Sequence, residues 1–451
     1  MKFIERKIND IKKNPYLVFF FGFAIIIFIG TLLLALPFAS QNGQSVGLIN
    51  AFFTATSATC VTGLVVVNTA NHWTLFGKIV IIILIQIGGL GVMTMTAMIS
   101  FFVGKRISLK TRVLIMEERN VDELQGVVRL TKNILIYTFG VEFAGAVLLS
   151  LVFIKDYGLA KGIAYSVFHA ISSFCNAGFD LLGNSMINYV DNSIITLAVC
   201  GLIVIGGIGY YVFWDIHVSK RFWMLTLHSK LVLIITAVLL VFSTVVMYVL
   251  EHDNPGTMGN LDVSGKINAS IFQAVNPRTA GYNSVPLENL RMATVAITVT
   301  LMFIGGSPAS TAGGIKTTTF GVLIISFYNL FKGKRDFEVF GRRIMPETTI
   351  RAAAILMISI MLVLSVSIVL SITEENSGYD YLDILYETVS AFATVGLTRG
   401  LTPLLSNPGK IILSILMFIG RVGPMTVAYA FLRQNKNIGN YTYPEGKIII
   451  G

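Results

Sequence analysis

The sequence predicts an all-α protein that crosses a membrane several times, and three observations support this fold class. Of the 451 residues, 54% are hydrophobic and only 13% are charged, which is too little polar surface for a water-soluble protein. Apolar runs long enough to cross the hydrocarbon core of a bilayer recur along the chain. A short segment that ends in glycine also recurs four times.

The apolar runs predict eight transmembrane helices, two in each of four repeats. Six runs contain no charged residue, and the other two contain only Glu142 and Arg421. The predicted spans are residues 16–37, 79–103, 133–154, 194–214, 231–250, 292–315, 352–373 and 411–432.

Lysine and arginine are unevenly distributed among the connecting segments. Segments 38–75, 179–193 and 373–385 contain none, and the basic residues gather in segments 1–14, 104–132, 215–230, 332–351 and 433–451. By the positive-inside rule, the basic segments and both termini are cytoplasmic. A net charge of +10 is also typical of nucleic-acid binding, but the agreement between charge and topology argues against a nucleic-acid partner.

The predicted boundaries follow from this topology. They are a cytoplasmic N-terminus (1–14), repeat 1 (15–110), repeat 2 (126–220), repeat 3 (225–335), repeat 4 (348–435) and a cytoplasmic C-terminal tail (436–451).

The recurring segments end at Gly63, Gly178, Gly281 and Gly396. An aromatic residue precedes the glycine by ten positions in the first, second and fourth copies and by nine in the third copy. Such a segment is too short to span the bilayer, so it predicts a re-entrant half-helix whose negative C-terminal end faces the centre of the protein. One such glycine would indicate only a turn, but four in register favour a ring of backbone carbonyls that binds a cation.

The residues next to these glycines complete the predicted filter. They are Cys60, Val61 and Thr62 in repeat 1, Cys175, Asn176 and Ala177 in repeat 2, Thr279 and Ala280 in repeat 3, and Thr394 and Val395 in repeat 4.

A glycine-rich stretch in the third repeat predicts a broken helix at membrane depth. In this repeat alone, we expect a flexible loop that projects into the conduction path and acts as a gate. A close-packed kink is the alternative. The residues are Gly305, Gly306, Ser307, Pro308, Ala309, Ser310, Thr311, Ala312, Gly313, Gly314 and Lys316.

Two cations lie within or beside the predicted spans. A guanidinium in mid-membrane is costly, so Arg421 is expected to face the pore as a barrier to cations or, alternatively, to extend to the inner interface. Lys316 is either an interfacial anchor or a pore-facing cation.

Other polar and glycine-rich features have simpler interpretations. Glycine-rich sequences at 88–91 and 206–209 favour close helix packing over dinucleotide binding, because no strand precedes them. His169 favours a packing role over metal ligation, Asp180 is either a cation-attracting or a solvated carboxylate, and the sequence predicts no partner for Glu142. The sequence contains no cluster of catalytic residue types, which argues against a membrane enzyme.

Several of these motifs together resemble the Trk/Ktr/HKT superfamily of potassium transporters, and most closely its Ktr-type membrane subunit. The resemblance covers essentially the whole chain and is carried by residues 54–64, 168–172, 276–284, 305–316 and 420–424. It implies four M1–pore loop–M2 units around one pore, with eight transmembrane and four re-entrant helices. Glycine at all four filter positions implies K⁺ as the transported ion, whereas some plant relatives with serine at the first position pass Na⁺ more readily.

The resemblance also implies partners. It predicts a homodimer in the lipid bilayer, seated on a cytosolic octameric ring of RCK-type subunits that bind ATP or ADP, with Na⁺ as a possible activator and no cofactor in this chain. Residues 337–343 and the basic loops are candidate docking surfaces, and the tail at 448–451 is a candidate dimer contact. A Na⁺- or H⁺-coupled K⁺ symporter of the same fold remains the alternative.

Overall fold

The computed structural model describes residues 15–91, 127–334 and 336–431, together with residues 94, 95, 97, 98, 112, 115 and 116. The predicted terminal segments 1–14 and 436–451, most of the basic segment 104–132 and the end of the predicted span 79–103 lie outside these residues.

Each repeat begins with a long apolar helix. These first helices are α2 (Pro15–Leu34), α8 (Val127–Tyr157), α12 (Leu227–Glu251) and α16 (Pro346–Thr373). Among the described residues, they are the four helices that are individually long and apolar enough to cross a membrane. At most 33% of their most apolar windows is buried inside the protein, so their remaining apolar surface suits contact with lipid.

A shorter helix follows and ends where each candidate filter segment begins. These pore helices are α3 (Leu48–Thr59), α9 (Leu159–Phe174), α13 (Val263–Val275) and α17 (Tyr381–Phe392). Asp262 caps α13 by accepting a hydrogen bond from the backbone N–H of Gly265 at 2.6 Å. Burial increases toward the C-terminal half of each pore helix, which places the filter segments inside the protein.

The second helix of each repeat is short or bent. These elements are α5 (Leu75–Leu90), α10 (Ser193–Ile208) with α11 (Tyr210–Ser219), α14 (Met292–Phe303) with α15 (Thr317–Phe331), and α18 (Asn407–Val422) with α19 (Pro424–Phe431). The remaining elements are α4 (Thr69–His72), an antiparallel pair of strands, β1 (Glu338–Val339) and β2 (Arg342–Arg343), and the 3₁₀ turns 37–39, 187–189, 222–224, 287–289, 375–377 and 402–404.

The prediction that only the third repeat has a broken helix was wrong. The chain bends by 89° between α10 and α11 at Gly209, and by 92° between α18 and α19 at Gly423. Gly91 likewise ends α5, and all three glycines have φ between 84° and 99°, which side chains with a β-carbon rarely adopt. Continuous helices over 194–214 and 411–432 are therefore not present, and α14 ends at Phe303 within the predicted span 292–315. The four long helices and the two bent pairs give up to six spans among the described residues, by length and composition.

Glycine also lets the second helices approach the pore helices. A Cβ added at Gly88, Gly206 or Gly420 would come closer than 3.0 Å to the carbonyl oxygen of the last residue of α3, α9 or α17, respectively. These contacts provide the close packing expected for the glycine-rich sequences at 88–91 and 206–209.

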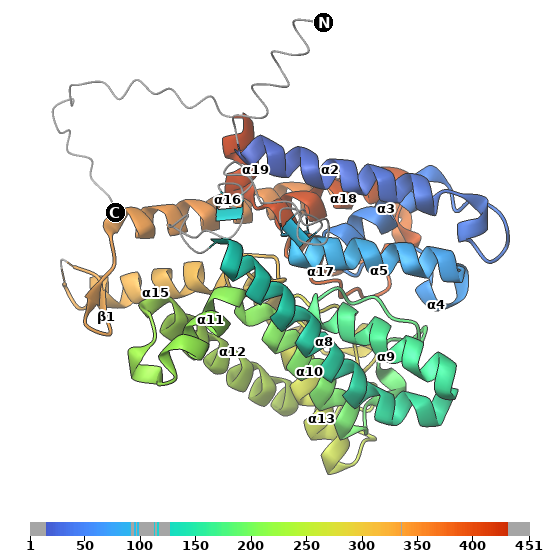
Figure 1. Cartoon of the computed structure of the whole chain (residues 1–451), viewed down its shortest axis with the longest axis horizontal. Coiled ribbons are helices and arrows are strands. Elements are labelled where there is room, and N and C mark those ends of the chain that lie inside the picture. Colours follow the sequence, from blue (N-terminus) through green and yellow to red (C-terminus); the bar gives the residue numbers. More distant parts are fainter. Residues whose placement is uncertain are drawn as a thin grey trace, which may run out of the picture.

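Repeat 4 packs against repeat 1, so the four repeats form a closed arrangement. Figure 1 shows the helices of repeat 1 beside those of repeat 4, and α3 packs on α18 while α2 packs on α19. The rings of Tyr16 and Tyr429, near the two ends of the described chain, lie 5.6 Å apart. Two core clusters, one centred on repeats 1 and 2 and the other on repeats 3 and 4, both include filter residues.

The glycine packing predicts a stability difference between two alanine substitutions in one helix. Gly206→Ala should lower the free energy of unfolding by about 1–3 kcal/mol, because its methyl group has no room against α9. Gly201→Ala in the same helix should be neutral or stabilising, since no atom lies within 4 Å of its added Cβ. The buried thiols of Cys60, Cys175 and Cys200 allow thermal unfolding in detergent to be followed with a thiol-reactive dye. Equal midpoints for the two variants would contradict the packing argument.

Candidate selectivity filter and intramembrane loop

Three of the pore helices end in the same left-handed turn. In α3, the N–H of Val61 donates to the Ala58 carbonyl at 3.2 Å and that of Thr62 to the Ser57 carbonyl at 2.8 Å. Repeats 2 and 4 contain the same two hydrogen bonds at equivalent positions. This pattern is a Schellman motif, which satisfies the last helical carbonyls and redirects the chain.

A residue other than glycine adopts the left-handed conformation in each turn. Val61, Asn176, Thr279 and Thr394 have φ between 52° and 72°. This conformation costs about 1–2 kcal/mol for a residue with a β-carbon, and β-branched residues rarely adopt it. Two positions later, each filter glycine also has a positive φ, between 69° and 95°. The four repeats therefore contain the same strained backbone, as is common at functional sites.

The four glycines form a closed ring. A Cβ added at Gly63 would come closer than 3.0 Å to the carbonyl oxygen of Ala177 in repeat 2. The same relation joins Gly178 to the Ala280 carbonyl, Gly281 to the Val395 carbonyl, and Gly396 back to the Thr62 carbonyl. In each repeat, the carbonyl of the residue before the glycine fills the space that a side chain on the glycine of the preceding repeat would need. Carbonyls from all four repeats therefore gather at one place.

Side chains on the pore helices hold the filter backbone. Ser57 accepts a hydrogen bond from the Gly63 N–H at 3.1 Å, and Ser390 accepts the equivalent bond from Gly396 at 3.1 Å. In repeat 2 the hydroxyl of Ser172 instead donates to the Phe179 carbonyl at 2.8 Å. Sequence analysis did not identify these serines, although each lies six residues before its glycine.

In the third repeat, Asn276 supports the filter backbone in place of serine and lies five residues, not six, before its glycine. The Asn276 carbonyl accepts a hydrogen bond from the Ala280 N–H at 3.0 Å, and its side-chain oxygen accepts from the Tyr282 N–H at 3.1 Å. Pro277 follows immediately and has no N–H to offer. This different closure accounts for the nine-residue spacing of the third segment.

The filter region contains unpaired oxygen atoms. Among the described residues, the buried hydroxyls of Thr62 and Thr394 have no hydrogen-bond partner. A buried polar group without a partner is costly, so these two oxygens are exceptions to the usual pairing of buried polar atoms. The C-terminal ends of the four pore helices add a partial negative charge at the same place.

The glycine-rich stretch of repeat 3 forms an irregular loop between α14 and α15. Its ends pair, with the Gly305 N–H donating to the Ile315 carbonyl at 2.9 Å. Between them, Ser307 and Thr311 donate backbone hydrogen bonds to the carbonyls of Gly207 and Gly206 at 3.0 and 3.3 Å. The loop is therefore not a simple kink, and it is bound to the break in the second helix of repeat 2.

Arg421 connects this loop to another repeat. Its guanidinium donates hydrogen bonds to the carbonyl oxygens of Thr311 in the loop and Gly88 in α5. Gly313 in the same loop packs against Ala393 and Thr394 beside the fourth filter segment. The structure thus places the loop against the fourth candidate filter segment, where Arg421 of repeat 4 also holds it. Lys316 donates to the Ala312 carbonyl at 2.6 Å, within the loop itself.

The structure gives partners to three residues that the sequence left open. Glu142 accepts a hydrogen bond from the Gln86 amide at 3.0 Å, and the Cys175 sulfur lies 4.0 Å from the same carboxylate. His169 accepts from the Leu181 N–H at 3.3 Å, and its other ring nitrogen lies 2.7 Å from the Tyr165 carbonyl, which is a packing role. Asp180 accepts from the backbone of the loop that follows it.

Glu387 is a buried carboxylate that sequence analysis missed. It lies in α17, is fully buried, and accepts a hydrogen bond from Thr402 beyond the fourth filter segment. Nearby, Asp383 pairs with Arg399, whose guanidinium also donates to backbone carbonyls of repeat 3. These contacts hold the residues that follow the fourth candidate filter segment. In the described part of the chain, no group of three or more potential metal-ligating His, Cys, Asp or Glu side chains occurs.

Comparisons with known proteins agree with this architecture. Residues 3–439 match the model of a family described as "TrkH: Cation transport protein". The chain is 43% identical to the potassium/sodium uptake protein NtpJ of Enterococcus hirae over 100% of both chains. It is 41% identical to the Ktr system potassium uptake protein B of Bacillus subtilis over 99% of both chains.

A solved structure supports the fold. The potassium transporter TrkH from Vibrio parahaemolyticus is similar with a TM-score of 0.71 and 17% sequence identity, over 91% of this chain and 84% of that one. The full-length matches confirm the resemblance stated from the sequence motifs, and this chain belongs to the TrkH/Ktr family of cation transporters.

Proposed function

We propose that this chain conducts K⁺ into the cell through a channel-like pore whose filter is the ring of Gly63, Gly178, Gly281 and Gly396. The observation that carries the proposal is the closure of the ring, in which each glycine meets a carbonyl of the next repeat. Backbone carbonyls replace the hydration shell of a permeating cation. The related proteins from B. subtilis are named as potassium uptake proteins, which supports the choice of ion.

We further propose that the loop 305–316 is the gate and that Arg421 is its latch, meaning the side chain whose hydrogen bonds hold the loop in the non-conducting position. The loop lies against the fourth filter segment, and its hydrogen bonds to repeat 2 and Arg421 are few and specific. Such a segment can exchange between two arrangements without unfolding a helix. The positive charge of Arg421 also raises the energy of a cation below the filter.

The partners follow from topology and from the names of relatives. Relatives described as parts of a "Ktr system" suggest additional subunits. We propose that the basic segments face the cytoplasm, that two copies of this chain dimerise, and that a ring of RCK-type subunits with bound ATP or ADP docks there. Na⁺ is proposed as an activator. The β1–β2 hairpin suits docking because it is exposed, with Phe340 at its tip.

Coupled transport is the second candidate function. Glu142 lies 4.0 Å from the sulfur of Cys175 at the second filter segment, and one carboxylate oxygen of the buried Glu387 has no hydrogen-bond partner in the described structure. A proton or Na⁺ on either carboxylate could couple to the filter. Uptake that persists in Glu142→Gln and Glu387→Gln, with an unchanged response to an imposed pH or Na⁺ gradient, would exclude these two groups.

The filter predicts a difference between two substitutions of left-handed glycines. Gly281→Ala and Gly158→Ala both place a β-carbon on a residue with positive φ, 75° and 78°, at a backbone cost of about 1–3 kcal/mol. Only Gly281→Ala also collides with a filter carbonyl, because no atom lies within 4 Å of an added Cβ at Gly158. Gly281→Ala should therefore abolish growth of a potassium-uptake-deficient bacterium at low K⁺, while Gly158→Ala should support it. Growth with both would refute the filter assignment.

The latch predicts a gain of conduction. A hydrogen bond from a charged group contributes about 1.5–3 kcal/mol, so Arg421→Ala should increase K⁺ flux without the ring subunits by roughly tenfold or more. Arg421→Lys keeps the charge but lacks the two-armed guanidinium, so it separates the latch from the electrostatic barrier. Flux is measured as Rb⁺ uptake into proteoliposomes, with the amount of inserted protein determined for each variant. Unchanged flux in Arg421→Ala would contradict the latch.

The docking surface predicts a local effect on assembly. Phe340→Ala should weaken co-purification of the ring subunits, because this side chain is 49% exposed at the tip of the hairpin. Phe331→Ala is the matched control, since this residue is 88% exposed at the end of α15, away from the tip. Equal retention of the ring by both variants would exclude the hairpin as a docking site.

A further inference from the structure

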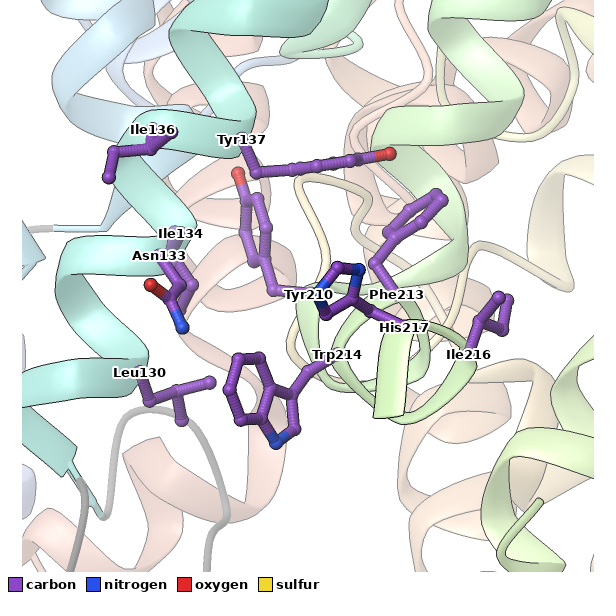
Figure 2. A pocket seen from close by; sticks show the side chains of 10 residues that line it. All are labelled: Leu130, Asn133, Ile134, Ile136, Tyr137, Tyr210, Phe213, Trp214, Ile216 and His217. Carbon is purple, nitrogen blue, oxygen red and sulfur yellow. The ribbon is translucent and has the colours of Figure 1, made fainter. Parts of the chain in front are cut away.

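An apolar pocket lies between the beginning of α8 and α11. Its volume is about 450 Å³. Figure 2 shows Leu130 and Asn133 of α8 on one side and Trp214 and His217 of α11 on the other. The rings of Tyr137 and Phe213 close one end, with centroids 4.5 Å apart. The transport mechanism proposed above does not use this pocket.

The position of α11 suggests that the pocket lies at the membrane surface. Because α11 is bent 89° from α10, it runs nearly parallel to the bilayer plane if α10 crosses the membrane. The following residues Phe222, Trp223 and Met224 are 41%, 82% and 68% exposed. Exposed aromatic side chains on such an element are typical of the headgroup level of a bilayer.

Four exposed cations lie four residues from lining residues along the chain, two on α8 and two just after α11. Arg129 and Lys132 precede the lining residues Asn133 and Ile136 by one helical turn on α8. Lys220 and Arg221 come four residues after the lining residues Ile216 and His217. None of these four cations takes part in an ion pair among the described residues. An apolar pocket edged by cations matches a ligand with an acyl chain and a negative headgroup.

A second apolar hollow offers a comparison. It has a volume of about 480 Å³, lies between α10, α12 and α13, and has no cation among its lining residues. Acyl chains can occupy it, but nothing in its lining selects for a charged headgroup.

We propose that the pocket between α8 and α11 binds one anionic phospholipid. An acyl chain lies in the pocket, and the headgroup phosphate is held by the cations on α8 and after α11. Binding at this place would brace the bend at Gly209, where the backbone N–H of Tyr210 donates to the Ala309 carbonyl of the intramembrane loop at 3.1 Å. The inference depends on the membrane orientation proposed above and not on the transported ion.

Tryptophan quenching tests the proposal directly. The chain contains three tryptophans, so Trp73→Phe/Trp223→Phe leaves Trp214 in the pocket as the sole reporter. The protein is reconstituted in vesicles with phosphatidylglycerol or phosphatidylcholine that carries brominated acyl chains, at equal mole fractions. We expect severalfold stronger quenching of Trp214 by brominated phosphatidylglycerol. Equal quenching by the two lipids would overturn the proposal.

Two variants define the site. Lys220→Gln/Arg221→Gln should reduce quenching by brominated phosphatidylglycerol to the phosphatidylcholine level. The matched control is Arg342→Gln/Arg343→Gln, an adjacent exposed pair on β2, which should keep the preference. Equal loss in both pairs would indicate general surface charge and overturn the site. Asn133→Phe fills the pocket and should lower quenching by both lipids.

A second measurement avoids the tryptophan changes. Native mass spectrometry of the otherwise unaltered chain should detect a retained phosphatidylglycerol molecule that is lost in Lys220→Gln/Arg221→Gln and kept in Arg342→Gln/Arg343→Gln. Retention in both variants would overturn the assignment of these cations to the headgroup.

Discussion

The structure depends on a lack of space where the four repeats meet. At each of the four filter glycines, the position that a Cβ would occupy is already taken by a carbonyl oxygen of the next repeat. The approach is possible only because the preceding residues turn the chain into the left-handed region as each pore helix ends. The turns are held by hydrogen bonds that backbone N–H groups after them donate to the side chains of Ser57, Ser390 and Asn276. A substitution at one of these positions therefore affects the filter segments of the neighbouring repeats as well as its own.

The second helices extend the same constraint away from the ring, along the breaks in their own backbone. Gly88, Gly206 and Gly420 allow these helices to pack against the pore helix ends, and the breaks at Gly91, Gly209 and Gly423 follow three residues later. The residues after the packing glycines are Gly89 and Gly207, whereas repeat 4 has Arg421 at this position. One arginine in place of glycine is thus enough to connect the otherwise symmetric frame to the loop of repeat 3.

Sequence reasoning identified the parts whose signal is a repeated pattern. Gly281 and its three equivalents were found because their spacing recurs, and the helical membrane fold follows from composition. The serines that support the filter recur at the same offset, yet serine is common in membrane helices and its hydrogen bond becomes visible only in the structure. The breaks at Gly209 and Gly423 were missed, although further glycines precede both and Pro424 follows the second, because Gly and Pro are frequent in continuous membrane helices as well. The contacts of Glu142 and Arg421 join residues 56 and 333 positions apart, a separation that no local pattern reports.

The buried carboxylates Glu251, Glu142 and Glu387 differ in how completely their oxygen atoms are hydrogen-bonded. Glu251 accepts hydrogen bonds from Asn254, Thr257 and the Arg291 N–H, and it joins the end of α12 to the start of α14. Its oxygen atoms are all engaged, so it has a structural role. Glu142 lies instead beside Cys175 of the second candidate filter segment, and one oxygen of Glu387, in the fourth pore helix, is unpaired in the described structure. A negative charge there would attract a cation through the low-dielectric interior, whereas a protonated carboxyl would not. If the ring conducts K⁺ as proposed above, the protonation state of these two residues would set how strongly the second and fourth repeats contribute to an otherwise symmetric ring.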